Sequence, residues 1–329
     1  MGDLQKIVDT AVAAARAKFA TQKLLAEELA VSLVDLRNAT RSVPAHYRGD
    51  APIYPASVVK LFYLVATHRW MEDGKITDTP ELRRALHDMI VHSGNEATAY
   101  VVDVLTGTTS GPELPAAELA QWLDRRNAVN RYFHALGYPE INANKKTWHD
   151  GPYGRDLQAV QQPRPDRNSL TTNATARLLV EIATGRAVSA ARSAQMLELM
   201  QRDFTSPNGT DYQGREFIGA ALPPTARLWS KAGDMSVARH DAALIELAGG
   251  AKLVLVIFTE KHSGQKEIIP EIARRILEGI SRNNQLLNSN SVDTVIKKLR
   301  ETKVLSPDEF ERTLEEHGLY CFMHDPPAF

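Results

Sequence analysis

A serine and a lysine stand three residues apart at the start of an apolar segment. Residues 54–64 read Tyr-Pro-Ala-Ser-Val-Val-Lys-Leu-Phe-Tyr-Leu, with the serine at 57 and the lysine at 60. A proline followed by an apolar run is typical of a helix start, and residues three apart share a helix face. Because burial lowers the pKa of a lysine, a neutral Lys60 amine can accept the Ser57 proton. The free N–H groups of a helix start would stabilise negative charge beside Ser57. The pattern predicts an activated nucleophile.

Two observations limit what this motif shows by itself. Ser-x-x-Lys is a short pattern, and it recurs at Ser263 and Lys266 in a polar segment, where we expect the lysine to be solvated. Only the apolar surroundings distinguish the first copy, so a catalytic role for Ser57 and Lys60 needs support from other segments.

A second motif, Ser93-Gly94-Asn95, interrupts an apolar and otherwise helical region. Serine and asparagine favour helix N-caps, so capping is its simplest interpretation. The Ser-x-Asn pattern also occurs at residues 206–208 and 281–283, and it is therefore weak on its own.

A third motif places Lys231 on an apolar strand, directly before Ala232, Gly233 and Asp234. Lysine in a strand is common at exposed edges, which is the alternative interpretation. The order of the three motifs is more informative than any one of them. Ser-x-x-Lys at a helix start, Ser-x-Asn in a helical region and Lys-x-Gly on a late strand form a combination that chance rarely supplies.

Composition excludes several classes of function. A net charge of −1 over 329 residues gives no electrostatic case for nucleic acid or an anionic membrane as partner. The single Cys321 excludes an internal disulfide, and the ten histidines show no ligand spacing along a helix, so we expect no metal and no cofactor. No apolar run is long enough to span a membrane, and no signal peptide is expected at the N-terminus. A cytoplasmic protein and an exported one whose leader has been removed both stay open.

Hydrophobic periodicity predicts helices and strands in an α+β order. The expected helices include residues 4–28 and, in a wholly helical region over 78–137, three helices: one from 80 to about 92, one from 95 or 96 to 107 and one over 115–136. Later helices are expected at 171–185, 188–202 and 270–281. The expected strands are residues 29–36, 42–48, 227–232, 240–247 and 252–259. Residues 138–169 are expected to form a long loop, and structureless loops of that length are usually functional.

Taken in order, the three motifs resemble those of the class A β-lactamases and the related penicillin-recognising DD-peptidases. The resemblance spans roughly residues 4–282. It implies that Ser57 is the acylated nucleophile and that Lys60 is its proton partner. It also implies that Ser93 relays a proton to the leaving nitrogen and that Asn95 binds an amide of the substrate. Proteins of this family are usually periplasmic or secreted.

The same resemblance assigns roles to the third motif. Lys231 would bind the substrate carboxylate and help lower the pKa of Lys60, and Ala232, Gly233 and Asp234 would line the substrate site. The backbone N–H groups of Ser57 and Asp234 would form the oxyanion hole.

Two features depart from the family pattern. Position 232 is alanine where the family has serine or threonine, which removes a hydroxyl that would help hold a carboxylate. Class A enzymes also place a glutamate in the long loop, with an asparagine four residues later, to activate the deacylating water. Residues 141–169 contain no glutamate. Asp156 lies at about the expected place but has no such asparagine, so a general base and a loop-capping aspartate both stay open. Without a base, the acyl-enzyme would persist.

We therefore predict an α/β (α+β) fold, with an antiparallel five-stranded sheet flanked by helices plus an all-α domain. Residues 1–282 would form a β-lactamase-like domain, with an α/β part at about 1–65 and 220–282 and an all-α part at about 66–219. Residues 283–329 would form a short helical extension.

The predicted function is a serine hydrolase that opens a β-lactam, peptide or ester through an acyl-enzyme. One alternative is a DD-peptidase-like or esterase activity with slow β-lactam turnover. The other is a non-catalytic penicillin-binding sensor whose extension contacts a partner.

Overall fold

The computed structural model describes residues 2–38, 44–138, 140–148, 150–161, 166–206 and 209–283. The chain divides into two units, Met1–Ile276 and Leu277–Phe329. Only residues 277–283 of the second unit are described, within a helix over 268–283. The predicted extension at 283–329 lies outside the described residues apart from Asn283, and its boundary stays a prediction. None of the described helices is both long and apolar enough to span a membrane.

In the part of the first unit that the structure describes there are ten helices besides the one that begins at residue 268. In chain order they are α1 (Gly2–Lys18), α2 (Lys60–Glu72), α3 (Pro80–Ile90), α4 (Asn95–Thr106), α5 (Ala116–Arg126), α6 (Ala128–Ala135), α7 (Gly154–Val160), α8 (Thr172–Ala183), α9 (Ala190–Met200) and α10 (Tyr212–Arg215). A 3-10 turn, η4 (Ala56–Val59), leads into α2.

The strands form one antiparallel sheet in the order β2-β1-β6-β5-β4-β3. Their bounds are β1 (Leu29–Asp35), β2 (Ala45–Tyr47), β3 (Gln201–Arg202), β4 (Arg227–Met235), β5 (Ala238–Glu246) and β6 (Lys252–Glu260). The antiparallel sheet is confirmed, but the predicted count of five strands was wrong, because β3 makes a sixth. Its two residues leave the end of α9 and pair with Trp229 and Leu228. Two polar residues carry no alternating pattern from which a strand can be recognised.

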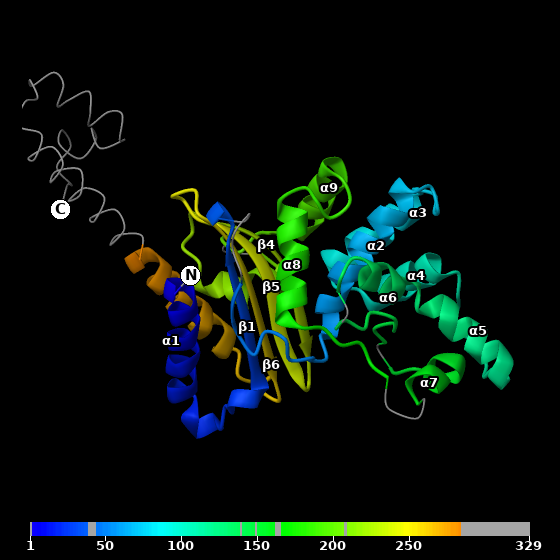
Figure 1. Cartoon of the computed structure of the whole chain (residues 1–329), viewed down its shortest axis with the longest axis horizontal. Coiled ribbons are helices and arrows are strands. Elements are labelled where there is room, and N and C mark those ends of the chain that lie inside the picture. The colour runs from blue at the N-terminus through cyan, green and yellow to red at the C-terminus, as the bar shows by residue number, and fades with distance from the viewer. Residues whose placement is uncertain are drawn as a thin grey trace, which may run out of the picture. The chain divides into compact units, whose positions relative to one another are not determined.

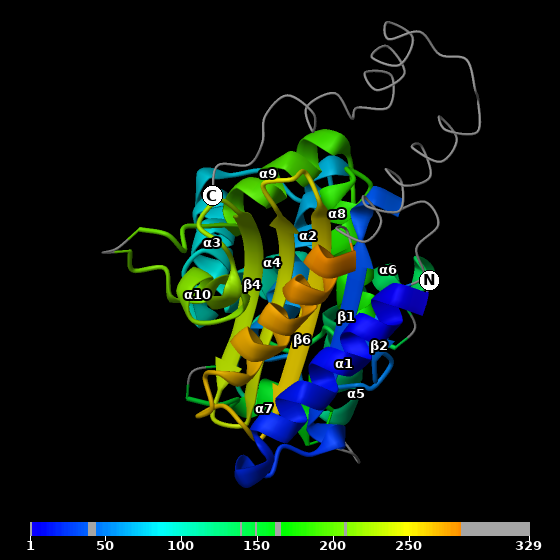
Figure 2. The same ribbon diagram turned by 90° about the vertical axis from the view of Figure 1, so that its left-hand side faces the viewer.

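Helices cover both faces of the sheet. Figures 1 and 2 show α1 on one face and α8 on the other, with α2 to α7 gathered beyond α8. Every residue of β1 is buried, and β5 and β6 are buried over nearly their whole length. A sheet covered on both faces explains why β1 and β6 are almost continuously apolar in the sequence.

Three predicted elements differ from the structure. The first helix ends at Lys18 rather than near residue 28, and Lys23 has a φ of 56°, which a helix does not contain. The helix predicted over 115–136 is broken at Asn127 into α5 and α6. The predicted loop at 138–169 contains the short helix α7.

One continuous core joins the sheet to the helical region. Ten of the 13 residues of α2 are buried, so this helix has apolar neighbours on all sides. Phe62 packs edge-on against Phe133 at 4.8 Å and against Tyr138 at 6.1 Å. The same cluster of buried side chains includes Val254 and Phe258 of β6. Packing of α2 therefore fixes the place of the Ser57 turn that precedes it.

Phe133 provides a test of this core. Replacing Phe133, which is 1% exposed, by alanine should lower the free energy of unfolding by about 3–5 kcal/mol, because both burial and ring packing are lost. The matched control is Tyr153→Ala, since Tyr153 is 61% exposed and should change stability by less than about 0.5 kcal/mol. Urea denaturation measures both. Equal effects of the two substitutions would contradict the assigned core.

Candidate active site

Ser57 lies in the 3-10 turn directly ahead of α2. The Val58 N–H closes this turn by donating to the Pro55 carbonyl oxygen at 3.0 Å. Ala56 has a φ of 45°, in the left-handed region that is unfavourable for residues other than glycine. The backbone next to Ser57 is therefore strained, and the surrounding structure must hold it in place.

His240 of β5 fastens this turn to the sheet. Its ring is fully buried, and burial lowers the pKa of His240 to about 4, so the ring is neutral near pH 7. Nδ1 accepts a hydrogen bond from the Thr259 N–H at 3.1 Å. The proton must then be on Nε2, which donates to the Tyr54 carbonyl oxygen at 2.8 Å.

Strand β4 reaches the Ser57 turn at Gly233. A Cβ atom at Gly233 would lie 2.7 Å from the Pro55 carbonyl oxygen and 3.2 Å from the Ser57 nitrogen. Only glycine allows the two backbones to approach this closely. Among the described residues, β3 pairs with β4 only at Leu228 and Trp229. Farther along β4, at Gly233, the edge of the strand that faces away from β5 lies against the Ser57 turn.

Lys60 is the first residue of α2 and is fully buried. Its Nζ lies 2.6 Å from the Ser93 carbonyl oxygen, 3.2 Å from Ser93 Oγ and 3.0 Å from Asn95 Oδ1. Burial lowers the pKa of Lys60 to about 7, against a smaller opposing effect of the Glu96 charge. Among the described residues, no hydrogen bond joins Lys60 Nζ to Ser57 Oγ, so the predicted contact is not made in this conformation.

Lys231 enters the same cluster from β4. It is fully buried, and its Nζ contacts Ser93 Oγ at 3.0 Å, Gln213 Oε1 at 2.5 Å and the Ala232 carbonyl oxygen at 2.7 Å. Burial lowers the pKa of Lys231 well below its usual value, and the nearby Lys60 charge lowers it further. The alternative of an exposed edge lysine is therefore wrong.

Ser93 connects the two lysines. It has a φ of 57° and follows the end of α3, where the Gly94 N–H donates to the Asp88 carbonyl oxygen at 2.9 Å. Its Oγ lies within hydrogen-bonding distance of both Nζ atoms. Burial raises the pKa of Tyr212 on α10, and its interaction with Ser93 opposes this shift. The geometry suits Ser93 to passing a proton from one group to another.

Two buried residues that the sequence did not indicate hold this cluster together. Gln213 accepts hydrogen bonds from Lys231 Nζ and the Ala232 N–H, and its amide donates to the Val91 carbonyl oxygen at 2.8 Å. Arg202 donates to the Ser230 carbonyl oxygen at 2.8 Å and to the Ile90 carbonyl oxygen at 2.9 Å. Both therefore link β4 to the end of α3. Neither lies in a recognisable motif, because only burial distinguishes them from the polar residues around them.

The remaining residues of the third motif lie beside this network. Ala232 is 2% exposed, so its methyl group is buried. Asp234 is partly exposed, and its Oδ2 accepts a hydrogen bond from the buried Arg239 at 2.8 Å. Arg239 therefore holds Asp234 at the end of β4, close to Gly233.

Asp156 is placed in a different network. It lies on α7, is 2% exposed and accepts a hydrogen bond from the buried Arg126 at 3.2 Å. Arg126 also contacts Asp103, and Lys146 donates to Asp103 Oδ2 at 2.6 Å. Among the described residues, none of the hydrogen bonds of Asp156 reaches Ser57, Lys60 or Ser93. The ion pair favours the interpretation that Asp156 anchors the loop.

The second Ser-x-x-Lys copy has the surroundings expected of it. Lys266 forms an ion pair with Glu216 at 2.9 Å, and its side chain is 60% exposed. The Ser263 hydroxyl donates to the Ser236 carbonyl oxygen at the surface. This copy provides an internal control for the first.

A cavity of about 520 Å³ lies away from these residues, against α8. Asp50, Tyr138, Arg177 and Glu181 are among its lining residues, and none of the predicted site residues is. Hydrogen bonding and burial, rather than the shape of the surface, define the candidate site.

Comparison with known proteins gives a family profile and several solved structures that match this chain. The profile of the Beta-lactamase enzyme family (Beta-lactamase2) matches residues 12–280, whereas no curated protein matches the chain significantly. A beta-lactamase from Sphaerobacter thermophilus DSM 20745 is 22% identical, covers 82% of this chain and 95% of its own, and has a TM-score of 0.59. A representative class A beta-lactamase from Bacteroides cellulosilyticus DSM 14838 is 15% identical over 84% and 98% of the two chains, with a TM-score of 0.58. A mutant of PBP-A is 17% identical over 86% and 97%, with a TM-score of 0.59.

At these identities the solved structures show a shared fold, and the family profile is the stronger finding. It covers most of the chain and almost all of the first unit. The resemblance inferred from the three motifs is thereby confirmed. The chain belongs to the beta-lactamase enzyme family.

Proposed function

We propose that the protein is a serine hydrolase of the class A type, in which a β-lactam or a related amide or ester acylates Ser57. Small-molecule substrates are what membership of the family implies. The observation that carries the proposal is the pair of buried lysines, Lys60 and Lys231, that share Ser93 Oγ next to the Ser57 turn. The Ser57 oxygen attacks the carbonyl carbon and gives up its proton. The bond from that carbon to nitrogen, or to oxygen in an ester, then breaks, and the leaving group takes up a proton. Water later hydrolyses the acyl-enzyme, which releases the acid and restores the Ser57 hydroxyl.

Lys60 is the proposed acceptor of the Ser57 proton. With a pKa of about 7, an appreciable fraction of Lys60 is neutral at neutral pH. Its neighbours are a carbonyl, a hydroxyl and an amide, none of which fixes it as a cation. Hydrogen bonds of catalytic groups are often long or unmade before substrate binds, so the missing Ser57–Lys60 bond is compatible with this role.

Ser93 would return the proton to the leaving nitrogen. Its Oγ is 3.2 Å from Lys60 Nζ and 3.0 Å from Lys231 Nζ, so a proton taken up by Lys60 has a short path through the hydroxyl. Asn95 would help to orient Lys60 and the substrate, since its Oδ1 accepts from Lys60 while its amide donates to the Trp148 carbonyl oxygen at 3.3 Å.

The backbone N–H groups of Ser57 and Asp234 are the proposed oxyanion hole. The close approach of Gly233 to the Ser57 nitrogen supports this assignment, because it brings the end of β4 against the Ser57 turn. Losing one such donor costs on the order of 3 kcal/mol of transition-state stabilisation.

Lys231 would act on a substrate mainly through its positive charge and would donate few hydrogen bonds to it. An ammonium group has three N–H donors, and Ser93, Gln213 and Ala232 provide three acceptors for them. No donor of Lys231 is then left for a substrate carboxylate unless one of these bonds is exchanged. Together with the missing hydroxyl at position 232, this favours substrates that do not depend on a carboxylate.

Slow deacylation, as in a DD-peptidase-like enzyme or an esterase, is the second candidate function. Residues 141–169 contain no glutamate, and the Asp156 carboxylate is paired with Arg126. A carboxylate in a buried ion pair is a poor general base for water. The similar PBP-A mutant was solved as an acyl-enzyme complex with penicillin-G, which supports a lasting acyl-enzyme in a protein of this fold.

Labelling by penicillin tests the nucleophile. Intact mass spectrometry should show one adduct on the wild-type chain and none on Ser57→Ala. The control is Ser263→Ala, which removes the serine of the second Ser-x-x-Lys copy and should label as the wild type does. Labelling of Ser57→Ala would refute the assignment. Following the adduct over time separates the two candidate functions, since a persistent adduct indicates slow deacylation and a clearing one indicates β-lactamase turnover.

The acylation rate should depend on the protonation of Lys60. Below a pKa of about 7 the neutral fraction falls tenfold per pH unit, so the rate should rise with pH and level off above about 7. Lys60→Ala should be much slower and lose this rise, whereas Lys252→Ala, at an exposed lysine of β6, should keep it. A wild-type rate that is flat from pH 5.5 to 8 would argue against Lys60 as the base.

Gly233→Ala tests the contact between β4 and the Ser57 turn. The added Cβ would lie 2.7 Å from the Pro55 oxygen, so the turn must move, and a displacement near 1 Å should slow acylation on the order of 100-fold. The overpacking should also cost about 1–3 kcal/mol of stability. Gly249→Ala is the matched control, because a Cβ there meets nothing within 4 Å. An unchanged rate in Gly233→Ala would show that the turn does not depend on this contact.

A further inference from the structure

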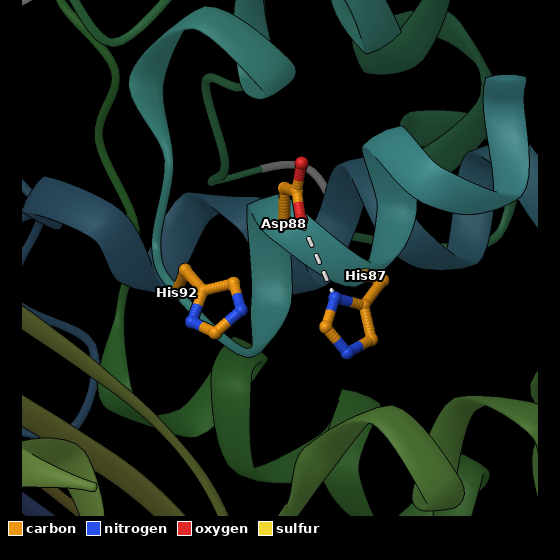
Figure 3. Close-up of side chains that lie close together, drawn as sticks. All are labelled: His87, Asp88 and His92. Carbon is orange, nitrogen blue, oxygen red and sulfur yellow. Dashed lines mark hydrogen bonds and ion pairs between the residues drawn. The ribbon is translucent and has the colours of Figure 1, made fainter. Parts of the chain in front are cut away.

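Three potential metal ligands meet at the end of α3, outside the network of Lys60 and Lys231. His87 and Asp88 belong to the last turns of α3, and His92 lies in the turn after it, as Figure 3 shows. One ligand atom from each of the three side chains lies within 4.8 Å of the others. The centroids of the His87 and His92 rings are 5.2 Å apart, and the angle between the ring planes is 67°.

The end of α3 explains why sequence spacing did not indicate this cluster. His87 and His92 are five residues apart, and on a continuous helix they would point about 140° away from each other. The helix stops at Ile90, and the chain turns back so that Gly94 N–H bonds to the Asp88 carbonyl oxygen. The expectation of no metal rested on the single cysteine and on the spacing of histidines along a helix, whereas here a turn brings the two rings together.

We propose that His87, Asp88 and His92 bind one zinc ion. Two imidazole nitrogens and a carboxylate oxygen are a ligand set that zinc uses, with a fourth position left for water. Zinc–ligand bonds of this kind place tetrahedral donors roughly 3.4 Å apart. The three donors, which lie within 4.8 Å of one another, therefore need to close by up to about 1.4 Å. His87 is 51% exposed and Asp88 is 32% exposed, and rotating such side chains disturbs no core packing.

The ion pair of Asp88 with Arg84 is compatible with a bound ion. Arg84 Nη1 donates to Asp88 Oδ2 at 2.9 Å, whereas Oδ1 is the oxygen that faces His87, at 3.3 Å from Nδ1. Zinc can therefore take Oδ1 and leave the Arg84 contact on Oδ2. The Arg84 charge is partly offset by its second ion pair, with Glu81.

Bound zinc would restrain the segment that carries Ser93. His92 is the residue immediately before Ser93, and the ion would tie it to the last turn of α3. The backbone bond from Gly94 to Asp88 already joins the same two parts of the chain. The proposal concerns binding, and it stands whether or not Ser57 is acylated.

Zinc titration in competition with a chromogenic chelator tests the proposal on the full chain. All samples carry Cys321→Ala, so that a zinc ion held by that thiol is not counted. The parent should bind one equivalent of zinc that the double variant His87→Gln, His92→Gln does not. Each single substitution should lower the zinc affinity by at least roughly 10–100-fold. Removing only a hydrogen-bond partner of a metal ligand already lowers metal affinity by that factor, and these substitutions remove a ligand itself. His134→Gln, at an exposed histidine of α6, is the matched control and should bind as the parent does.

Thermal unfolding with and without zinc gives a second measurement. The parent should show a higher Tm with zinc, and the double variant should show no zinc-dependent shift, because an ion that binds the folded state stabilises it. Circular dichroism of the zinc-free double variant should match the parent, as expected for surface side chains. Equal zinc binding by parent and double variant would overturn the proposal, and so would the absence of binding by the parent at millimolar zinc.

Discussion

The structure of the site depends on burying two lysine side chains around one hydroxyl group. Lys60 and Lys231 are both fully buried, yet among the described residues neither Nζ is hydrogen-bonded to a carboxylate. Their partners are carbonyl, amide and hydroxyl groups, which can accept a hydrogen bond but cannot neutralise a charge. A buried cation without a counter-ion is costly, and the cost is relieved by lowering the pKa of the amine. With uncharged partners only, the Lys60 and Lys231 amines can take up and release protons more readily than lysines held in ion pairs.

The rest of the unit supplies the acceptors and keeps them in place. Gln213 and Arg202 bind the last carbonyl groups of α3 and the backbone of β4, so the turn bearing Ser93 and the strand bearing Lys231 are held together. His240 and Gly233 do the same for the Ser57 turn, one by a hydrogen bond to Tyr54 and the other by having no side chain. Ser57, Ser93 and Lys231, which are the proposed nucleophile, the proposed proton relay and the second buried lysine, come from three separate parts of the chain. Their relative positions rest on these few buried contacts.

A site residue could be predicted from the sequence only where the pattern that identifies it is visible in the sequence itself. Ser57 and Lys60 could be recognised because their spacing is local and their apolar surroundings are visible in the sequence. Lys231 could be recognised only from its order relative to the other motifs, since a lysine in a strand is by itself common at exposed edges. Gln213 and Arg202 could not, because their importance comes from partners far along the chain. The strand β3 and the proximity of His87 and His92 were missed for a different reason, because both depend on the residue at which a helix ends.

In the long loop, the proposed function and the stability of the fold make different demands on Asp156. A general base for deacylation needs a carboxylate that faces water and the acyl group. Asp156 is instead buried against Arg126, and Arg126 is shared with Asp103, which also binds Lys146. Freeing Asp156 would leave a buried guanidinium short of a partner, an arrangement costing several kcal/mol. The loop is therefore held by the carboxylate that catalysis would need. Under the proposed function, a chain that keeps this ion pair would form an acyl-enzyme through its lysines, and release of the acyl group would rely on another base or proceed slowly.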